Sequence, residues 1–290
     1  MNQLEFFESL PKSEKIINVA TVPFRSPFRY AGGKTWLVPR IRTWLQQRGG
    51  IDKTLIEPFA GGGIVGLTAA FEKLVDQVVL VEKDEDVAAV WRVILSEDAP
   101  WLANEIMNFD LTTENAQKAI NNANRGLKER AFATIVKNRV NRGGILANGA
   151  SFLKYGEGGK GIKSRWYPKT LRNRILDIYE IKEHISFLEG DAFEILEKNK
   201  SIKNTVFFID PPYTVAGRRL YRYSELDHET LFEATIKLEG DFLMTYDNSE
   251  YIQKLANTYK LETRLVPMKN THHNTKLELL IGRNLSWIEN

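Results

Sequence analysis

The stretch from Thr205 to Thr214 constrains the fold of this chain more than any other. Its first five residues are β-branched or aromatic, and the string Asp210-Pro211-Pro212-Tyr213 follows them directly. Such an apolar run predicts a buried strand. Each proline fixes its own φ, donates no backbone hydrogen bond and pushes the residue before it toward an extended conformation. We therefore expect Asp210 at the carboxyl end of a strand, the edge at which open α/β sheets bind ligands.

The residues that end this strand suit chemistry on a weakly nucleophilic aromatic amine. Asp210 and the Pro211 carbonyl can accept hydrogen bonds from amino protons, which favours the charge that the nitrogen acquires in a transition state. Tyr213 offers a flat face on which a base can stack. A bare Pro-Pro after a strand more often marks only a loop. The complete four-residue string is far more specific than that dipeptide.

A second strand, turn and helix lie earlier in the chain. The short apolar strand ending at Glu57 is followed by Gly61, Gly63 and Gly66, which have the dinucleotide-binding spacing G-x-G-x-x-G. The next predicted strand, 77–81, ends at Glu82, where an acidic residue about 20 positions after the first glycine can accept hydrogen bonds from ribose hydroxyls. An ordinary surface charge is the alternative for Glu82. Together these elements predict a nucleoside-containing cofactor.

A third predicted strand, 185–188, leads into Gly190-Asp191-Ala192-Phe193. Asp191 then lies at the same sheet edge as Asp210, and Phe193 can pack against a cofactor ring. The alternative is that Asp191 only caps the helix predicted over 192–197. The residues alone do not separate these two interpretations.

Positive charge is concentrated in one segment. Between Arg125 and Arg174 the chain has 13 Lys and Arg against two acidic residues, although the formal charge of the whole chain is only +3. Glycines and aromatic residues are interleaved with these charges, a pattern that suits phosphate contact and base stacking. A solvated surface is the alternative. We predict contacts with nucleic acid from four residues of this segment: Arg139, Arg142, Lys160 and Arg165.

Taken together, these motifs resemble the Dam-like (D12 class, alpha-group) DNA adenine-N6 methyltransferases. Tyr30-Ala31-Gly32-Gly33-Lys34 is similar to the family's N-terminal motif, and Pro58 to Gly63 is similar to its glycine loop. Asp210 to Tyr213 matches the catalytic motif unchanged, whereas Glu82 stands where the family usually has aspartate. The resemblance implies catalytic roles for Asp210, Pro211, Pro212 and Tyr213. It also implies that S-adenosylmethionine is bound by these residues: Tyr30, Lys34, Phe59, Gly61, Gly63, Glu82, Asp191, Phe193 and Asp210.

The same resemblance implies an α/β fold, a Rossmann-like methyltransferase sheet of seven mostly parallel strands. Residues 1–98 and 183–290 would form the catalytic domain, with an inserted target-recognition region over 99–182. The implied activity is site-specific methylation of the N6 amino group of an adenine flipped out of duplex DNA. An RNA or N4-cytosine amino-methyltransferase is the main alternative, and a nicotinamide-dependent dehydrogenase is a weaker one. The recognised DNA sequence does not carry over.

Composition limits the remaining classes of protein. The chain has no cysteine and no histidine pair with ligand spacing, so we predict no metal site. No apolar run approaches the roughly 20 residues of a membrane span, and the N-terminus does not resemble a signal peptide. We expect a cytoplasmic enzyme of a prokaryote or phage, active as a monomer on double-stranded DNA. Whether a cognate restriction endonuclease accompanies it is left open.

Overall fold

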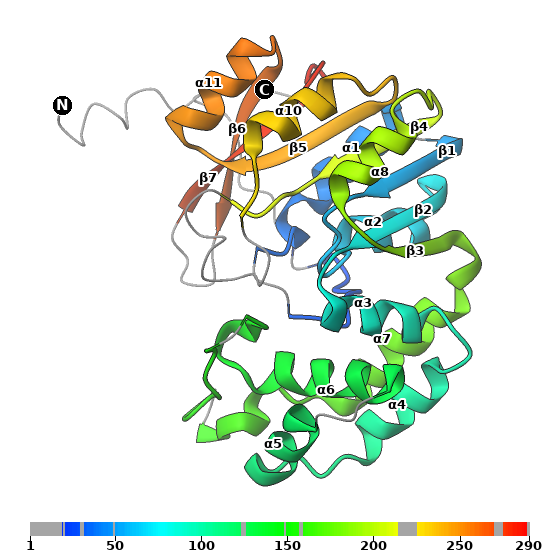
Figure 1. The fold of residues 1–290 in the computed structure, drawn as a ribbon, viewed down its shortest axis with the longest axis vertical. Coiled ribbons are helices and arrows are strands. Elements are labelled where there is room, and N and C mark those ends of the chain that lie inside the picture. Colours follow the sequence, from blue (N-terminus) through cyan, green and yellow to red (C-terminus); the bar gives the residue numbers. More distant parts are fainter. Residues whose placement is uncertain are drawn as a thin grey trace, which may run out of the picture.

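The strands form a single sheet in the order β3-β2-β1-β4-β5-β7-β6 in the computed structural model of the chain (Figure 1). β7 pairs antiparallel with both β5 and β6, whereas the other pairs are parallel. This arrangement confirms the predicted seven-stranded, mostly parallel sheet. The strands span β1 Gly50–Glu57, β2 Val75–Glu82, β3 Ile185–Glu189, β4 Thr205–Ile209, β5 Asp241–Asp247, β6 Glu262–Lys269 and β7 Thr275–Gly282.

The structure describes residues 19, 21–29, 32–48, 50–122, 126–147, 149–156, 159–213, 225–269 and 275–288. Its α-helices are α1 Val38–Arg48, α2 Ile64–Phe71, α3 Glu85–Ile94, α4 Ala99–Asn108, α5 Thr113–Asn121, α6 Leu127–Val140, α7 Pro168–Glu180, α8 Ala192–Asn199, α10 His228–Ile236 and α11 Glu250–Thr258. Short 3-10 turns lie at Thr35–Leu37, Arg142–Gly144, Gly161–Arg165 and Lys182–His184. None of the helices described is long and apolar enough to cross a membrane.

Both faces of the sheet are covered by helices, and successive strand residues pack against opposite faces. On β4, Val206 and Phe208 belong to a core shared with α1, α2 and α3, whereas Phe207 and Ile209 pack against the side covered by α8, α10 and α11. The whole strand is buried. Burial on both faces explains why its sequence is a continuous apolar run instead of an alternating one.

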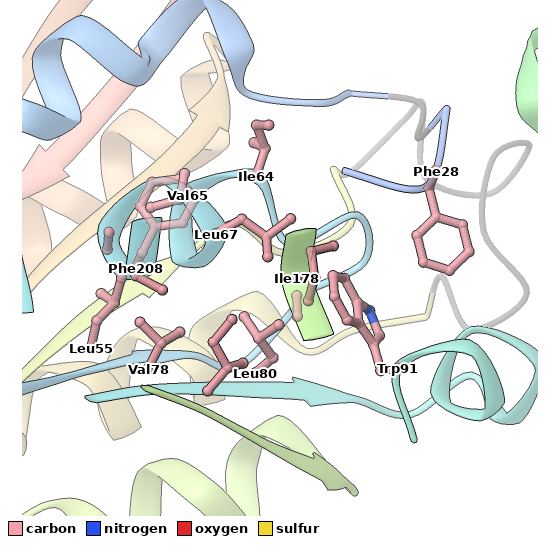
Figure 2. Close-up of a cluster of buried hydrophobic side chains, with 14 of the residues drawn as sticks. Phe28, Leu55, Ile64, Val65, Leu67, Val78, Leu80, Trp91, Ile178 and Phe208 are labelled. Carbon is pink, nitrogen blue, oxygen red and sulfur yellow. The ribbon is translucent and has the colours of Figure 1, made fainter. Parts of the chain in front are cut away.

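The helices of the inserted region, residues 99–182, lie beside α3 at the bottom of Figure 1. Side chains from α4, α6 and α7 join the same hydrophobic core as the sheet, among them Leu102, Ile135 and Ile175. Figure 2 shows Ile178 of α7 next to Trp91 of α3 and near residues of the sheet. The inserted region is therefore held against the sheet by a continuous apolar core.

Candidate active site

Residues at the carboxyl ends of four adjacent parallel strands meet around one cavity. Glu57 ends β1, Glu82 ends β2, Asp191 follows β3 and Asp210 follows β4, and all four line this cavity. The order of strands reverses between β1 and β4, the topological switch point at which open α/β sheets bind ligands. The lining also contains other residues that the sequence predicted: Lys34, Phe59, Gly61, Gly63, Phe193 and Pro212. Tyr30 lies outside the described residues.

The glycine loop between β1 and α2 is shaped by close packing against Trp91. Gly63 has φ +61°, and a Cβ at that position would lie 2.8 Å from Trp91 Cζ2. The Trp91 indole Nε1 donates to the Gly61 carbonyl at 3.0 Å. At Gly66 a Cβ would lie 2.6 Å from Leu80 Cδ2. Glycine at these positions therefore lets the loop and α2 approach the sheet closely, which leaves the cavity open above them.

The carboxylate of Glu82 organises the backbone of the cavity. Its Oε2 accepts a hydrogen bond from Gly61 N at 3.0 Å, and its Oε1 accepts from Lys83 N at 2.8 Å and Asp84 N at 2.9 Å. Burial raises the pKa of Glu82 to about 7, against the effect of these donors. A carboxylate offers about four lone-pair positions, so Glu82 keeps capacity to accept a further hydrogen bond.

Asp191 combines the two roles that the sequence left open. Its Oδ1 accepts from Phe193 N at 2.9 Å, which makes it the N-cap of α8, and its Oδ2 lies 2.8 Å from Lys83 Nζ. It also lines the cavity, as does Phe193. Capping therefore fixes the position of Asp191 at the edge of the cavity and does not remove it from the site.

The Asp210 carboxylate is held through one of its oxygens. Lys34 Nζ lies 2.9 Å from Oδ1, and the Thr245 hydroxyl donates to the same oxygen at 2.6 Å. The side chain of Lys34 is only 4% exposed, so this ion pair is shielded from water on the lysine side. Lys34 also donates to the Gly32 carbonyl at 3.0 Å. These contacts orient Asp210 with its Oδ1 engaged by donors of the protein.

Tyr213 packs behind Asp210. Its hydroxyl donates to Glu278 Oε2 at 2.5 Å, and its ring stacks against Tyr246 with centroids 6.1 Å apart. Lys34 Nζ lies 5.0 Å from the centre of the Tyr213 ring. Among the described residues the cavity lining includes Pro212 but neither Pro211 nor Tyr213. Tyr213 is thus placed beside the cavity instead of in its wall.

Three residues of this cluster were missed from the sequence: Glu57, Thr245 and Glu278. Glu57 is 3% exposed and accepts from Gly66 N at 2.8 Å, and burial raises its pKa to about 8. It ends β1 directly before Pro58, the same position that Asp210 has after β4, so its placement could have been predicted. Glu278 lies on β7 and Thr245 on β5, and burial also raises the pKa of Glu278. No local pattern points to either residue.

The basic residues predicted to contact DNA are not equivalent. Arg142 and Lys160 are exposed, and Arg165 is partly buried. Arg139 is only 4% exposed, and its Nη2 donates to the Pro27 carbonyl at 2.5 Å. Burial lowers the pKa of Arg139 to about 9, with a further contribution from the charges of Arg174 and Arg29. This burial does not fit a direct contact of Arg139 with DNA and corrects that expectation, because the guanidinium is enclosed by the protein.

Within the described ranges, no cluster of three acidic or histidine side chains is placed to hold a metal ion. The donor set of the cavity instead combines carboxylates, aromatic rings and a glycine loop. Such a set suits an organic ligand with hydroxyl groups and a ring.

Several solved structures that resemble the chain are described as methyltransferases. They include a precorrin-6y C5,15-methyltransferase from Geobacter metallireducens GS-15, at 9% identity and a TM-score of 0.37, over 87% of this chain and 91% of that one. An rRNA methyltransferase from Streptomyces viridochromogenes matches at 13% identity and a TM-score of 0.39, over 88% and 86%. A SAM-dependent O-methyltransferase from Thermotoga maritima matches at 11% identity and a TM-score of 0.37, over 85% and 64%.

No curated protein matches the chain. The model of the D12 class N6 adenine-specific DNA methyltransferases, in contrast, matches residues 30–271. This range includes the glycine loop, the inserted region and the Asp-Pro-Pro-Tyr string. The chain therefore belongs to the D12 class N6 adenine-specific DNA methyltransferases, enzymes whose methyl donor is S-adenosylmethionine.

Proposed function

We propose that this enzyme methylates the N6 amino group of an adenine that is flipped out of duplex DNA, at a specific sequence. The observation that carries the proposal is the position of Asp210. Its carboxylate follows β4 at the sheet edge, is held on one oxygen by Lys34 and Thr245, and lines the same cavity as the glycine loop. A base must leave the stack to reach such a recessed carboxylate.

The residues of the cavity fit S-adenosylmethionine. Glu82 has capacity for a ribose hydroxyl, Phe59 and Phe193 offer aromatic surface to a purine ring, and the glycine loop allows close approach of the backbone. Asp191, which caps α8 and pairs with Lys83, can accept a hydrogen bond from an adenine amino group. Bound there, S-adenosylmethionine supplies an electrophilic methyl group. We assign its binding to Lys34, Phe59, Gly61, Gly63, Glu82, Asp191, Phe193 and Asp210.

Asp210 and the Pro211 carbonyl would bind the target amino group. Because both described donors to Asp210 reach Oδ1, Oδ2 would be the oxygen that accepts from the amino protons. Accepting these hydrogen bonds favours the electron-rich nitrogen that methyl transfer requires. The Tyr213 ring lies beside the cavity and is fixed through its hydroxyl by Glu278, so it would provide the stacking surface for a base that enters next to Asp210 and not within the cavity itself. Positioning and electrostatics therefore account for the catalytic contribution of these side chains.

Exposed charges support duplex DNA as the polymer that carries this adenine. Arg142 and Lys160 lie on the surface of the inserted region, and the Tyr155 ring is 83% exposed close to Lys160 in sequence. Lysines and an exposed aromatic ring are suited to phosphate and base contacts. An RNA substrate would use the same chemistry, so the assay must contain both polymers. The alternative of a dehydrogenase is rejected, because the family that the chain matches consists of methyltransferases.

The test is transfer of a labelled methyl group from S-adenosylmethionine to mixed-sequence duplex DNA, with RNA in parallel, followed by nucleoside analysis. We expect the label in N6-methyladenine of DNA, and mapping the modified positions would give the target sequence. Asp210→Ala should abolish transfer while the thermal stability stays close to that of the wild type. Label in cytosine or in RNA would contradict the proposed substrate. Normal turnover by Asp210→Ala would contradict the proposed role of the carboxylate.

A further inference from the structure

Residues 26–29, here called the N-terminal segment, lie between the inserted region and the cavity. Asn138 of α6 holds this segment by both functions of its amide: Arg29 N donates to Asn138 Oδ1 at 2.8 Å, and Asn138 Nδ2 donates to the Arg29 carbonyl at 3.0 Å. Nδ2 also donates to the Gly144 carbonyl at 2.8 Å. Asn138 is fully buried, so these bonds form without competition from water.

Two arginines of the inserted region also bind backbone carbonyls of the N-terminal segment. Arg139 Nη2 donates to the Pro27 carbonyl at 2.5 Å, and Arg174 Nη1 reaches the Ser26 carbonyl at 3.4 Å. Gly144 packs directly on the segment, because a Cβ there would lie 2.2 Å from the Arg29 carbonyl oxygen. Side chains and backbone of the inserted region therefore determine where this segment runs.

The opposite side of the segment reaches the catalytic machinery. The Ser26 hydroxyl donates to the Gly62 carbonyl of the glycine loop at 2.6 Å, and Phe28 packs against Trp91, which itself binds Gly61. A few residues along the chain, Lys34 pairs with Asp210. Asn138 itself is not part of the cavity lining, whereas Ser26 and Phe28 are.

From these contacts we infer that Asn138 is a positioning residue that couples the inserted region to the cofactor and catalytic sites through the N-terminal segment. The inference rests on the proposed function, because it assigns target recognition to the inserted region. A displacement of α6 or of the turn at Arg142–Gly144 is transmitted by two amide hydrogen bonds to Arg29, and along the N-terminal segment to Ser26, which binds Gly62. Asn138 acts through these groups and touches no substrate.

Two pairs of variants test this role. Asn138→Ala removes the bonds to Arg29, whereas Thr134→Ala removes a buried hydroxyl that binds the Arg130 carbonyl within the same helix, α6. Gly144→Ala forces a side chain against Arg29, whereas Gly149→Ala has a comparable positive φ, +84° against +73°, and meets no atom within 4 Å. Neither control variant touches the N-terminal segment. Gly144 also lines the cavity whereas Asn138 does not, so Asn138→Ala decides whether the effect passes through the segment.

The measurements are the dissociation constant of S-adenosylmethionine without DNA, the single-turnover rate at saturating DNA and cofactor, and the thermal unfolding temperature. We expect Asn138→Ala and Gly144→Ala to weaken cofactor binding and to slow transfer by about tenfold to 100-fold, the range for small misplacement of reacting groups. The affinity for DNA in a gel-shift assay should stay unchanged. Thr134→Ala and Gly149→Ala should keep the wild-type rate and cofactor affinity, even where they lower the unfolding temperature.

Wild-type cofactor affinity and rate in Asn138→Ala would overturn the inference. It would also be overturned if the control variants lost as much as their partners, because the effect would then follow general destabilisation. If the wild-type enzyme methylates no DNA, the proposed function fails on its own. The comparison of cofactor affinities would still decide the role of Asn138.

Discussion

Lys34 Nζ and Asp210 Oδ1 lie 2.9 Å apart, although one residue precedes the first strand of the sheet and the other follows its fourth. The ion pair connects the N-terminal motif to the Asp-Pro-Pro-Tyr string across the switch point of the sheet. It fixes the carboxylate by a directional, charge-assisted contact. Four experiments follow from this pair and its surroundings.

The first prediction concerns the orientation of Asp210. Lys34→Met should reduce the single-turnover rate by about 100-fold, because a reacting group that is misplaced by about 1 Å can cost that much. Thr245→Val, which removes the hydroxyl donor but nearly preserves the shape of the side chain, should cause a smaller loss. Lys118→Met removes an exposed i,i+4 ion pair with Glu114 and should leave the rate unchanged. Equal rates for Lys34→Met and Lys118→Met would show that the ion pair does not position Asp210.

The second prediction concerns stability and pH. Burial raises the pKa of Glu57 from 4.5 to about 8, so between these values the folded protein binds more protons than the unfolded chain. The free energy of unfolding should therefore fall as pH rises from about 4.5 to about 8, by about 1.36 kcal/mol for each unit of pKa difference. Glu57→Gln cannot ionise, and its amide oxygen can still accept from Gly66 N.

Urea unfolding of the wild type and of Glu57→Gln over this pH range is the measurement. As pH rises, the unfolding free energy of Glu57→Gln should increase relative to that of the wild type. Glu72→Gln is an informative control, because hydrogen bonding to Arg42 lowers the pKa of Glu72. The stability that this carboxylate contributes is lost only below about pH 4.5, so between about pH 4.5 and 8 the difference between Glu72→Gln and the wild type should stay constant. A pH-independent difference for Glu57→Gln would refute the buried, proton-binding state of this carboxyl.

The third prediction concerns the bond between Tyr213 and Glu278. Tyr213→Phe keeps the ring but leaves a buried carboxyl without its hydroxyl donor, which should cost about 1–3 kcal/mol of unfolding free energy. A double-mutant cycle with Glu278→Gln should show a coupling of about 0.5–3 kcal/mol. Tyr259→Phe removes an exposed hydroxyl that lies 3.4 Å from Glu233, and its effect should be close to zero. An additive double mutant would mean that the two side chains do not stabilise each other.

The fourth prediction separates exposed from buried basic residues. The quantity to compare is the slope of the logarithm of the DNA association constant against the logarithm of the salt concentration. Arg142→Ala and Lys160→Ala should each reduce the size of this slope by about one unit for every phosphate that the native side chain neutralises. Lys203 is the control, because its side chain is 81% exposed and lies just before β4, at the end of the strand opposite to Asp210. Lys203→Ala should leave the slope unchanged. Arg139→Met should lower the unfolding temperature, because its guanidinium binds the Pro27 carbonyl inside the protein. If Arg142→Ala and Lys160→Ala both kept the salt slope of the wild type, DNA would not contact these two side chains.

Part of the sheet could be predicted from the residues alone, because several strands are short apolar runs that end in a polar motif, whereas the number of strands followed from the family resemblance. β4 and the ends of β2 and β3 follow directly from such runs, and parallel pairing brings their carboxyl ends together. Helix α6 was not predicted: its buried residues include Asn138 and Arg139 as well as Ile135, so no clean apolar stripe exists. Helix α11 was also missed, although Ser249 caps it and Ile252, Leu255 and Ala256 share one buried face.

The candidate site was predictable only where a residue lies within a local motif. Glu82, Asp191 and Asp210 end strands or follow them directly, so sequence position determines their place. Glu278 reaches Tyr213 only because β7 inserts antiparallel between β5 and β6, a long-range arrangement that no local pattern encodes. The burial of Arg139 likewise depends on the path of residues 26–29, which come from the other end of the chain.

We propose that the inserted region recognises the target sequence, and the continuous core beneath it then limits how specificity can change in evolution. Because α4, α6 and α7 contribute Leu102, Ile135 and Ile175 to the same core as the sheet, the region cannot be exchanged between relatives as an independent cassette. A graft that replaced these helices would have to re-establish packing against α3. New specificities are therefore expected to arise by substitution and by change of length in the surface turns beyond Val140, while the helices that carry them are inherited with the sheet.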